Sequence, residues 1–375
     1  MTATAPLRIV VIAPLRFPIR RPHAGGLESA VWNEVSQLRR RGHSVTLIAP
    51  EGSDFLGPED AFSIPPLAWP DRARPTDDTY PDSYYCRTIP ALGRALDKVS
   101  AQSGSYDLIS NHCLHGLPLS RAGELGVPMV TTLHTPVDRH LVESHARATG
   151  RRSEFMAVSE HTRVQWAAAG VDSHVLPNAV DPDTWRLGRG GGDLVWFGRI
   201  VPEKAPHLAI EVAKRLGRTL VIAGRIGDDD YADRHVVPAL GDSIRYAGQL
   251  SPVQLARLVG RSACSISTPA WEEPFGLVAP EALMCGTPVV SFAVGGVTEI
   301  AAASVGMETA PRNDISELAD RAAGLIDRTD RDPEFRRAIR GAAQSRYSLP
   351  VRTAALEERF RTVLAGPAEA EEVAA

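Results

Sequence analysis

The sequence contains little cysteine, no long hydrophobic run and no excess of positive charge. Its four cysteines lie far apart along 375 residues and form no CxxC motif, so neither a disulfide framework nor a structural zinc site is indicated. No segment approaches the roughly 20 apolar residues of a transmembrane helix. The formal net charge of -4 argues against a basic surface for nucleic acid. We therefore predict a reduced, cytoplasmic protein without a transmembrane segment or a nucleic-acid partner, and peripheral membrane contact stays open.

Length and composition predict two globular domains. With 43% hydrophobic and 23% charged residues, the chain is long for one core and comfortable for two. The apolar run 9–13 is too short for a signal peptide and ends at Pro14. The Gly-rich stretch 188–193 has the composition of a linker. We place the first domain at 1–187, the second at 188–347, a C-terminal helix at 348–366 and a frayed tail at 367–375.

Short apolar runs alternate with helical periodicity in both halves, which predicts an α/β protein with doubly wound parallel sheets. A strand at 7–13, a helix at 29–40 and a strand at 44–49 form the first βαβ unit. Further strands are expected at 108–110, 129–133, 155–158, 174–176, 194–197, 219–223, 244–246, 264–267 and 288–292. Further helices are expected at 92–102, 118–125, 161–169, 206–216, 252–259, 277–284, 333–345 and 350–364. Residues 51–90 are expected to be mostly irregular.

The segment Glu273-Pro-Phe-Gly-Leu-Val-Ala-Pro-Glu281 follows a predicted strand and opens a predicted helix. Pro280 fits only in the first turn of a helix, which places the helix start near Leu277. The N–H groups of residues 275–277 would then be free to bind an anion such as a phosphate. Glu281, one turn inside the helix, could accept two hydrogen bonds from a ribose diol, and Glu273 could hold sugar hydroxyls. The alternative for Glu281 is an acid that only the helix dipole favours.

A second segment, Phe197-Gly-Arg-Ile-Val-Pro-Glu-Lys204, also joins a strand to a helix. Arg199 offers a planar, bidentate donor and Lys204 offers a mobile point charge. Together they could neutralise the two charges of a diphosphate leaving group. The alternative is a solvated pair of surface cations.

The first half carries two weaker signals after predicted strands. His23-Ala-Gly25-Gly26-Leu27-Glu28 resembles a phosphate-approach loop but lacks the G-x-G-x-x-G spacing, and a plain glycine turn is the alternative. His134 ends a strand and would point into a cleft, unless it is a structural histidine. The other histidines lack metal-ligand spacing, and 228–230, Asp-Asp-Asp, is better interpreted as a solvated acidic turn than as a chelate. We therefore expect no metal and no cofactor.

Taken together, these segments resemble the retaining glycosyltransferases of family 4, which have the GT-B fold of two Rossmann-like domains facing a central cleft. The resemblance covers nearly the whole chain and is strongest over 195–300. The pieces that match, in chain order, are Gly25-Gly26, His134, Val158-Ser159-Glu160, 177–181 (Pro-Asn-Ala-Val-Asp), Gly198-Arg199 with Lys204, Gly248, 273–277 with Glu281, 286–290 (Gly-Thr-Pro-Val-Val) and Gly295-Gly296 with Glu299. The spacing of Glu273 and Glu281 around Pro-Phe-Gly is the most specific of them.

The resemblance implies a role for each matching residue. Arg199 and Lys204 would hold the donor diphosphate, Glu281 the ribose and Glu273 the donor-sugar hydroxyls. The residues implied in further donor contacts are Gly25, Gly26, Gly198, Phe275, Gly276 and Leu277. His134 would lie near the reacting carbon, and the C-terminal helix would cross back onto the first domain. Two departures are Asn178-Ala179 for Asn-Gly and Lys204-Ala205 for Lys-Gly.

The expected reaction is transfer of a hexose from a nucleotide diphosphate sugar to a hydroxyl, with the leaving phosphate acting as the base. A UDP-sugar is favoured and a GDP-sugar is second. The acceptor is a small molecule, a natural product, a glycan or a lipid, read by loops in 51–90 and 138–152. The alternatives are a sugar-nucleotide epimerase or phosphorylase of the same fold, and a nucleotide-sugar binding protein without turnover.

Overall fold

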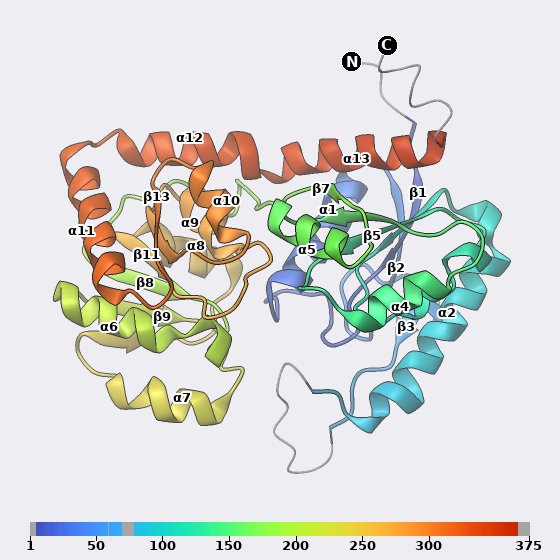
Figure 1. Cartoon of the computed structure of the whole chain (residues 1–375), viewed down its shortest axis with the longest axis horizontal. Helices are drawn as coiled ribbons and strands as arrows, with labels where there is room; N and C mark the ends of the chain where they lie inside the picture. Colours follow the sequence, from blue (N-terminus) through green and yellow to red (C-terminus); the bar gives the residue numbers. More distant parts are fainter. Residues whose placement is uncertain (1–4, 59, 70–78, 367–375) are drawn as a thin grey trace. The chain divides into compact units, whose positions relative to one another are not determined.

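The computed structural model describes residues 5–58, 60–69 and 79–366, and over these residues the chain forms two compact units (Figure 1). Unit 1 holds the residues up to Leu176 together with those from Arg352 onward, and unit 2 is Pro177–Val351. The tail 367–375, predicted to be frayed, lies outside the described residues.

Unit 1 is built on a seven-stranded parallel sheet with the order β3-β2-β1-β4-β5-β6-β7. Its strands are β1 (Arg8–Ile12), β2 (Ser44–Pro50), β3 (Ser63–Ile64), β4 (Leu108–Asn111), β5 (Met129–Leu133), β6 (Glu154–Ala157) and β7 (His174–Val175). The order reverses between β1 and β4, which pair in parallel. Loops at the carboxyl ends of these central strands therefore diverge, and ligands of doubly wound sheets bind at such a switch point.

Helices cover both faces of the unit 1 sheet. They are α1 (Gly26–Arg40), α2 (Ile89–Ala101), α3 (Leu117–Ser120), α4 (Arg139–Arg147), α5 (Glu160–Ala168) and α13 (Leu349–Ala365). Alternate residues of β1 point to opposite faces. Ile9 packs in one cluster with Val35 of α1 and Phe360 of α13, whereas Val10 packs in another with Leu92 of α2. The C-terminal helix thus supplies part of the unit 1 core.

Unit 2 has a six-stranded parallel sheet with the order β10-β9-β8-β11-β12-β13. Its strands are β8 (Leu194–Phe197), β9 (Leu220–Ala223), β10 (Ile244–Tyr246), β11 (Cys264–Ser267), β12 (Val289–Phe292) and β13 (Met307–Ala310). Its helices are α6 (Pro206–Leu216), α7 (Asp229–His235), α8 (Pro252–Gly260), α9 (Val278–Met284), α10 (Val297–Ala302), α11 (Ile315–Arg331) and α12 (Phe335–Tyr347). The order reverses between β8 and β11, so the two motif-bearing loops follow adjacent strands.

The two doubly wound parallel sheets confirm the predicted fold class, but several elements differ from expectation. In 51–90, of which 59 and 70–78 lie outside the described residues, slightly more than half of the described residues are irregular, as expected; the rest include β3 and a five-residue π-helix, Tyr84–Thr88, that leads directly into α2. The helix expected at 118–125 is divided into α3 and a 3-10 turn, Ala122–Glu124. The sequence patterns also did not predict α4, α7, α10, α11 and β13. Three of these helices begin at an Asp N-cap whose side chain accepts a backbone N–H, a short-range signal that was available.

Candidate functional site

The loops after β8 and β11 are joined to each other in unit 2. The Ala270 N–H donates to the Glu203 carbonyl over 2.8 Å, and the Thr268 hydroxyl donates to the Lys204 carbonyl over 3.2 Å. These bonds bring the Lys204 ammonium to the Glu273 carboxylate, and the two groups form a hydrogen-bonded ion pair. The two side chains are 23% and 13% exposed, so a ligand can reach the pair. The structure therefore brings two sequence-predicted site residues into direct contact.

Glu273 is held from several directions. The indole Nε1–H of Trp271 donates to its carboxylate over 2.9 Å, and the Lys204 ammonium lies 5.1 Å from the centroid of the same indole. The Gly296 N–H donates to the Glu273 carbonyl over 2.8 Å. Gly295 has φ +51°, and a Cβ there would lie 2.2 Å from that carbonyl oxygen. The loop after β12 therefore requires glycine in order to hold the Glu273 backbone in place.

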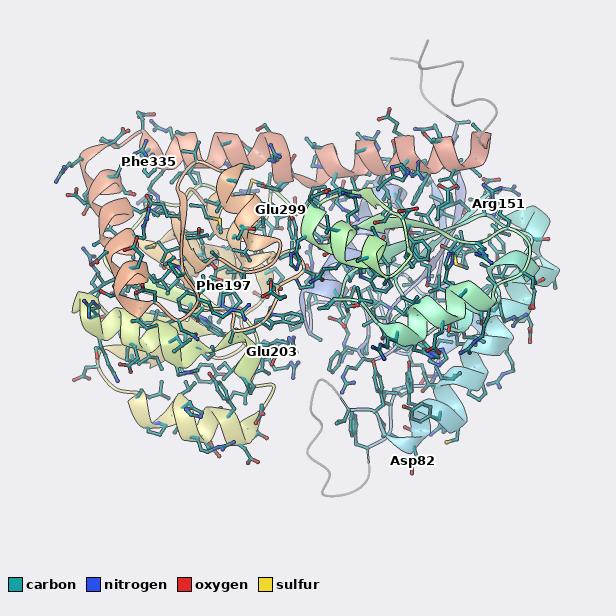
Figure 2. The ribbon with its side chains drawn as sticks, viewed as in Figure 1. Asp82, Arg151, Phe197, Glu203, Glu299 and Phe335 are labelled. Carbon is teal, nitrogen blue, oxygen red and sulfur yellow. The ribbon has the colours of Figure 1, made fainter. Side chains whose placement is uncertain are left out.

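Arg199 lies in the loop after β8, which Figure 2 marks with Phe197 at its start and Glu203 near its end. Arg199 Nη2 donates to Glu203 over 3.3 Å, and both side chains are partly exposed. Ala205, at the end of this loop, has φ +44° and ψ +53°. That left-handed conformation is unfavourable for a residue with a Cβ, and it explains why glycine is the usual residue there in the resemblance noted above.

The loop before α9 presents unused backbone donors. Within the described residues, the N–H groups of Phe275, Gly276 and Leu277 make no hydrogen bond. Gly276 has φ +93°, and a Cβ there would approach Val297 to 3.0 Å. The helix begins at Val278, within one residue of the predicted start at Leu277. Because α9 is only seven residues long, the free N–H groups matter more here than a helix dipole.

Glu281 lies in the first turn of α9 and is half-buried. Burial raises the pKa of its carboxyl to about 8. Among the described residues it has no ion-pair or hydrogen-bond partner that would stabilise its charge. A half-buried carboxyl group without a partner is available to a ligand whose hydroxyl groups donate hydrogen bonds to it and so favour its charged form.

In unit 1, Gly25 and Gly26 connect the segment after β1 to α1. Gly25 is the N-cap of α1 in an extended conformation, and its carbonyl accepts the Ser29 N–H over 3.1 Å. A Cβ at Gly25 would lie 3.0 Å from a carboxylate oxygen of Glu28, which is buried. Gly25 therefore leaves little space for a side chain at the start of α1.

His134, directly after β5, is bonded to a second histidine that follows β4. His112 Nδ1 and His134 Nε2 are 2.9 Å apart, and His112 Nε2 lies 3.0 Å from the Glu34 carboxylate of α1. Glu34 also accepts the Ser110 hydroxyl over 2.6 Å and Arg352 Nη1 over 3.2 Å. All of these groups except the partly buried His134 are buried, and they come from two strand ends and two helices of unit 1.

The acidic run 228–230 is solvated at Asp229 and Asp230, as expected, but it begins a helix instead of forming a turn. The Asp228 side chain accepts the Tyr231 N–H over 2.9 Å and caps α7, while Asp229 and Asp230 lie in its first turn. This correction follows from the favourable placement of acids at helix N-termini. No group of three or more His, Cys, Asp or Glu side chains that could hold a metal occurs over the described ranges.

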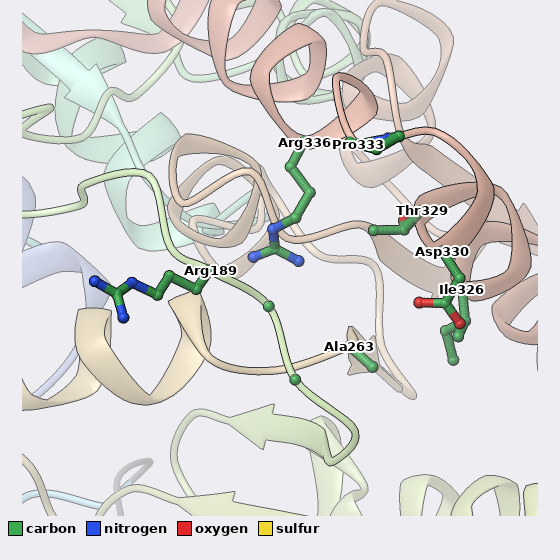
Figure 3. A pocket seen from close by; sticks show the side chains of 9 residues that line it. Arg189, Ala263, Ile326, Thr329, Asp330, Pro333 and Arg336 are labelled. Atoms are coloured by element: carbon green, nitrogen blue, oxygen red, sulfur yellow. The ribbon is translucent and has the colours of Figure 1, made fainter.

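A pocket of about 340 Å³ occurs elsewhere in unit 2 and contains none of the sequence-predicted site residues (Figure 3). It is lined by Arg189, Gly190, Gly191, Ala263, Ile326, Thr329, Asp330, Pro333 and Arg336. Arg336 Nη2 donates to the Gly260 carbonyl over 3.1 Å and to the Thr287 hydroxyl over 2.9 Å. These bonds fasten α12 to the end of α8, which is a structural function.

The two doubly wound parallel sheets are those of the GT-B fold of nucleotide-sugar-dependent glycosyltransferases. The model of the glycosyl transferases group 1 matches residues 187–346, and that of Glycosyltransferase Family 4 matches residues 24–184. The chain belongs to glycosyltransferase family 4, as the sequence resemblance indicated.

Curated relatives agree with this assignment, and solved structures share the fold. The D-inositol 3-phosphate glycosyltransferase of Mycobacteroides abscessus is 30% identical over 353 residues, which cover 79% of this chain and 76% of the relative. Sucrose-phosphate synthase from Thermosynechococcus elongatus is 18% identical, with a TM-score of 0.75 over 96% of this chain and 100% of that one. Anabaena HepE in complex with UDP-glucose is 18% identical, with a TM-score of 0.68 over 95% and 99%. No helix in the described ranges is long and apolar enough to cross a membrane.

Several residues around the site were missed by the sequence analysis. Trp271 lies two residues before Glu273, but this position in the sequence did not indicate that its indole N–H donates to the Glu273 carboxylate. His112 follows β4 directly, so the rule that flagged His134 would have flagged it too. Glu34 stands on the buried face of α1, between Val31 and Leu38, and an acid in that position is itself a signal. Arg352 had no local signal.

Proposed function

We propose that this glycosyltransferase transfers a hexose from a UDP-sugar, or secondarily a GDP-sugar, to a hydroxyl with retention of anomeric configuration. The UDP preference is supported by the fold likeness to HepE, which was solved in complex with UDP-glucose. The acceptor is a hydroxylated small molecule, natural product, glycan or lipid. In this proposal the domain 1–187 binds the acceptor, 188–347 binds the donor, and the helix 348–366 crosses back to the first domain.

The observation that carries the proposal is the Lys204–Glu273 ion pair beside the free N–H groups of residues 275–277. A cation, three backbone donors and a carboxylate in one loop cluster match the charges and hydroxyl groups of a sugar diphosphate. The pair is partly exposed, so its ammonium can exchange the carboxylate for a phosphate at little cost.

Each donor-binding group then has a defined part. Arg199 and Lys204 bind the diphosphate and absorb its developing charge, and Gly198 lets the chain approach it. Glu273 accepts hydrogen bonds from the sugar hydroxyls. The residues that complete donor binding through backbone N–H groups are Phe275, Gly276 and Leu277. Glu281 accepts both hydroxyls of the ribose, which supplies the hydrogen-bond donors that its carboxylate lacks in the free protein.

In unit 1, the proposal assigns Gly25 and Gly26 to backbone contacts with phosphate and acceptor, and His134 to a position beside the donor sugar. The reaction proceeds on one face of the sugar: the bond from the anomeric carbon to the phosphate oxygen breaks as the acceptor oxygen bonds to that carbon. The acceptor proton passes to the leaving phosphate. The protein contributes positioning and electrostatic stabilisation.

Thermal shift against nucleoside diphosphates and their sugars tests donor binding. A millimolar ligand with micromolar affinity adds about 4 kcal/mol of stability, so UDP should raise the melting temperature more than GDP or ADP. Consumption of the matching donor with a panel of hydroxylated acceptors tests turnover. Saturable binding without consumption by any acceptor would contradict the enzymatic part, and formation of free sugar epimers or sugar phosphate would replace transfer by epimerisation or phosphorolysis.

Metal independence and cytoplasmic location belong to the same proposal. Because Arg199 and Lys204 supply the positive charge, turnover should be unaffected by EDTA. Loss of turnover with EDTA and its recovery with magnesium would contradict this role of the two cations. The cytoplasmic location is supported by the four cysteines, all free and three of them buried.

A further inference from the structure

A chain of buried polar groups ends at His134. Arg352 and Ser110 both donate to the Glu34 carboxylate, over 3.2 Å and 2.6 Å. His112 Nε2 lies 3.0 Å from the same carboxylate, and His112 Nδ1 lies 2.9 Å from His134 Nε2. The side chains of Glu34 and His112 are at most 1% exposed. Water therefore does not substitute for the bonds to Glu34.

The protons in this chain can be placed by counting donors and acceptors. Burial disfavours ionisation of Glu34, but its contacts with His112, Arg352 and Ser110 outweigh burial and hold the pKa of its carboxyl well below the usual range. An ionised carboxylate only accepts, so His112 Nε2 must carry a hydrogen and donate to it. His112 Nδ1 and His134 Nε2 then share one hydrogen between them.

Charge balance decides which histidine holds that hydrogen. The negative charge of Glu34 is already matched by Arg352, so a protonated histidine would leave a net positive charge in a dry site. Burial, with the Arg352 guanidinium nearby, also lowers the pKa of His134 well below its ordinary value. The shared hydrogen is therefore placed on His134, whose Nε2–H donates to His112 Nδ1. Among the described residues, His134 Nδ1 makes no hydrogen bond.

We propose that Arg352, Glu34 and His112 form a relay of positioning residues that fixes the tautomer of His134, so that its Nδ1 presents a lone pair to a substrate hydroxyl. The proposal rests on the proposed function, because it gives His134 its chemical part in that reaction. The hydroxyl donates to Nδ1, and no positive charge is placed beside the sugar. A histidine free to choose its tautomer would present an N–H in part of the population.

Glu34→Gln tests the relay because it changes hydrogen-bond direction with little change in shape. The carbonyl of the introduced amide keeps the bond from Arg352, and the amide NH₂ faces His112 Nε2, which must now accept. His112 then carries its hydrogen on Nδ1 and donates to His134 Nε2, which moves the His134 hydrogen to Nδ1. We expect kcat to fall by about 10–100-fold, with the donor KM and the UDP thermal shift unchanged.

Glu357→Gln is a matched control in the same unit. Glu357 is a buried carboxylate of α13 that pairs with Arg41 and with His43, whose Nε2 is 2.8 Å away. The tautomer of His43 is set independently by the Leu7 N–H, which donates to His43 Nδ1 over 2.9 Å. This group lies at the amino ends of the strands, before β2, whereas the His134 relay lies at their carboxyl ends. We expect a lower melting temperature in both variants but a kcat within about twofold of wild type only in Glu357→Gln.

Ring ¹⁵N NMR of histidine-labelled protein measures the tautomer directly and needs no turnover. The wild-type His134 signals, assigned with His134→Gln, should show a protonated Nε2 and an unprotonated Nδ1, and Glu34→Gln should reverse them. A wild-type His134 with a protonated Nδ1 would overturn the relay even if the enzyme is active. An inactive chain with the expected signals would instead remove the proposed function and leave the relay standing. Reversed signals with unchanged kcat would also overturn the proposal.

Discussion

The two units hold their candidate site side chains in opposite ways. In unit 2, Lys204 and Glu273 form a partly exposed ion pair, and Arg199 is paired with Glu203 at 3.3 Å. In unit 1, the Glu34 and His112 side chains are buried. His112 uses one ring nitrogen to bond Glu34 and the other to bond His134. The partly exposed Lys204 and Arg199 can exchange their carboxylate partners for a ligand. The buried His112 imidazole, in contrast, is restricted to one tautomer by its two hydrogen bonds.

This difference has an energetic consequence. Partly exposed ion pairs contribute roughly 0–1 kcal/mol to stability, so unit 2 can give them up to bind phosphate. Removing one partner of a buried ion pair costs roughly 3–5 kcal/mol, so unit 1 cannot rearrange its relay during turnover. Substitutions in the Lys204 cluster should therefore change activity alone, while those in the Glu34 cluster should change activity and stability together.

The largest effect is expected from removing a cation of unit 2. Arg199→Ala and Lys204→Ala should each lower turnover by about a hundredfold, equivalent to roughly 3 kcal/mol, because each removes charge that stabilises the leaving diphosphate. The melting temperature should stay within a few degrees of wild type. Steady-state kinetics and thermal unfolding measure the two quantities.

Lys214→Ala is the control for these variants, because Lys214 forms an exposed pair with Glu211 on α6 at 2.9 Å. It should leave turnover and stability unchanged. Near-normal turnover in both Arg199→Ala and Lys204→Ala would show that these cations do not stabilise the leaving diphosphate. The proposed difference between the two units would then be wrong.

A second effect concerns Glu281, whose folded pKa of about 8 lies above the ordinary value of 4.5. A raised carboxyl pKa contributes stability that is complete below pH 4.5 and is lost as pH rises through 8. Glu281→Gln stays neutral, so the free variant should gain stability over wild type as pH rises through this window, by roughly 4 kcal/mol at about pH 8. It should bind UDP about tenfold more weakly, since the amide accepts the ribose hydroxyls less well.

Glu317→Gln is the control that distinguishes a ribose-binding Glu281 from an acid that is favoured only by the helix dipole. Glu317 also lies in the first turn of its helix, α11, but it is exposed and bonded to Arg321 at 2.7 Å. Its replacement should affect neither UDP affinity nor the pH dependence of unfolding. If Glu281→Gln behaves like Glu317→Gln in UDP titrations and pH-dependent melting, Glu281 is a dipole-favoured acid and no ribose ligand.

The smallest effect is expected at Ala205, where φ is +44°. Ala205→Gly should raise the free energy of unfolding by about 1 kcal/mol, because glycine adopts this conformation without strain. Urea unfolding measures it, with Ala209→Gly in the interior of α6 as the opposite control, which should destabilise. A loss of stability in Ala205→Gly would show that the Ala205 methyl, 1% exposed, packs more favourably than its backbone is strained.

Local patterns predicted the elements that carry the site. The strand runs at 194–197 and 264–267 coincide with β8 and β11, and Pro280 placed the start of α9 within one residue. These features depend on neighbours a few residues apart, which is what periodicity and helix-cap rules describe. The helices α4 and α11, which were not predicted, each begin at an Asp N-cap. Hydrophobic periodicity does not detect such a residue.

By itself, the sequence determined which loops follow strands, and so which side chains lie at the carboxyl ends of the sheets: Arg199, Lys204, Glu273 and His134. Only the tertiary structure decided how these side chains are paired. Lys204 meets Glu273 because β8 and β11 are adjacent, and Arg352 meets Glu34 across 318 residues because α13 returns to unit 1. Such pairings depend on strand order and helix docking. Both are determined by the burial of entire sheet and helix faces, which the spacing of neighbouring residues does not reveal.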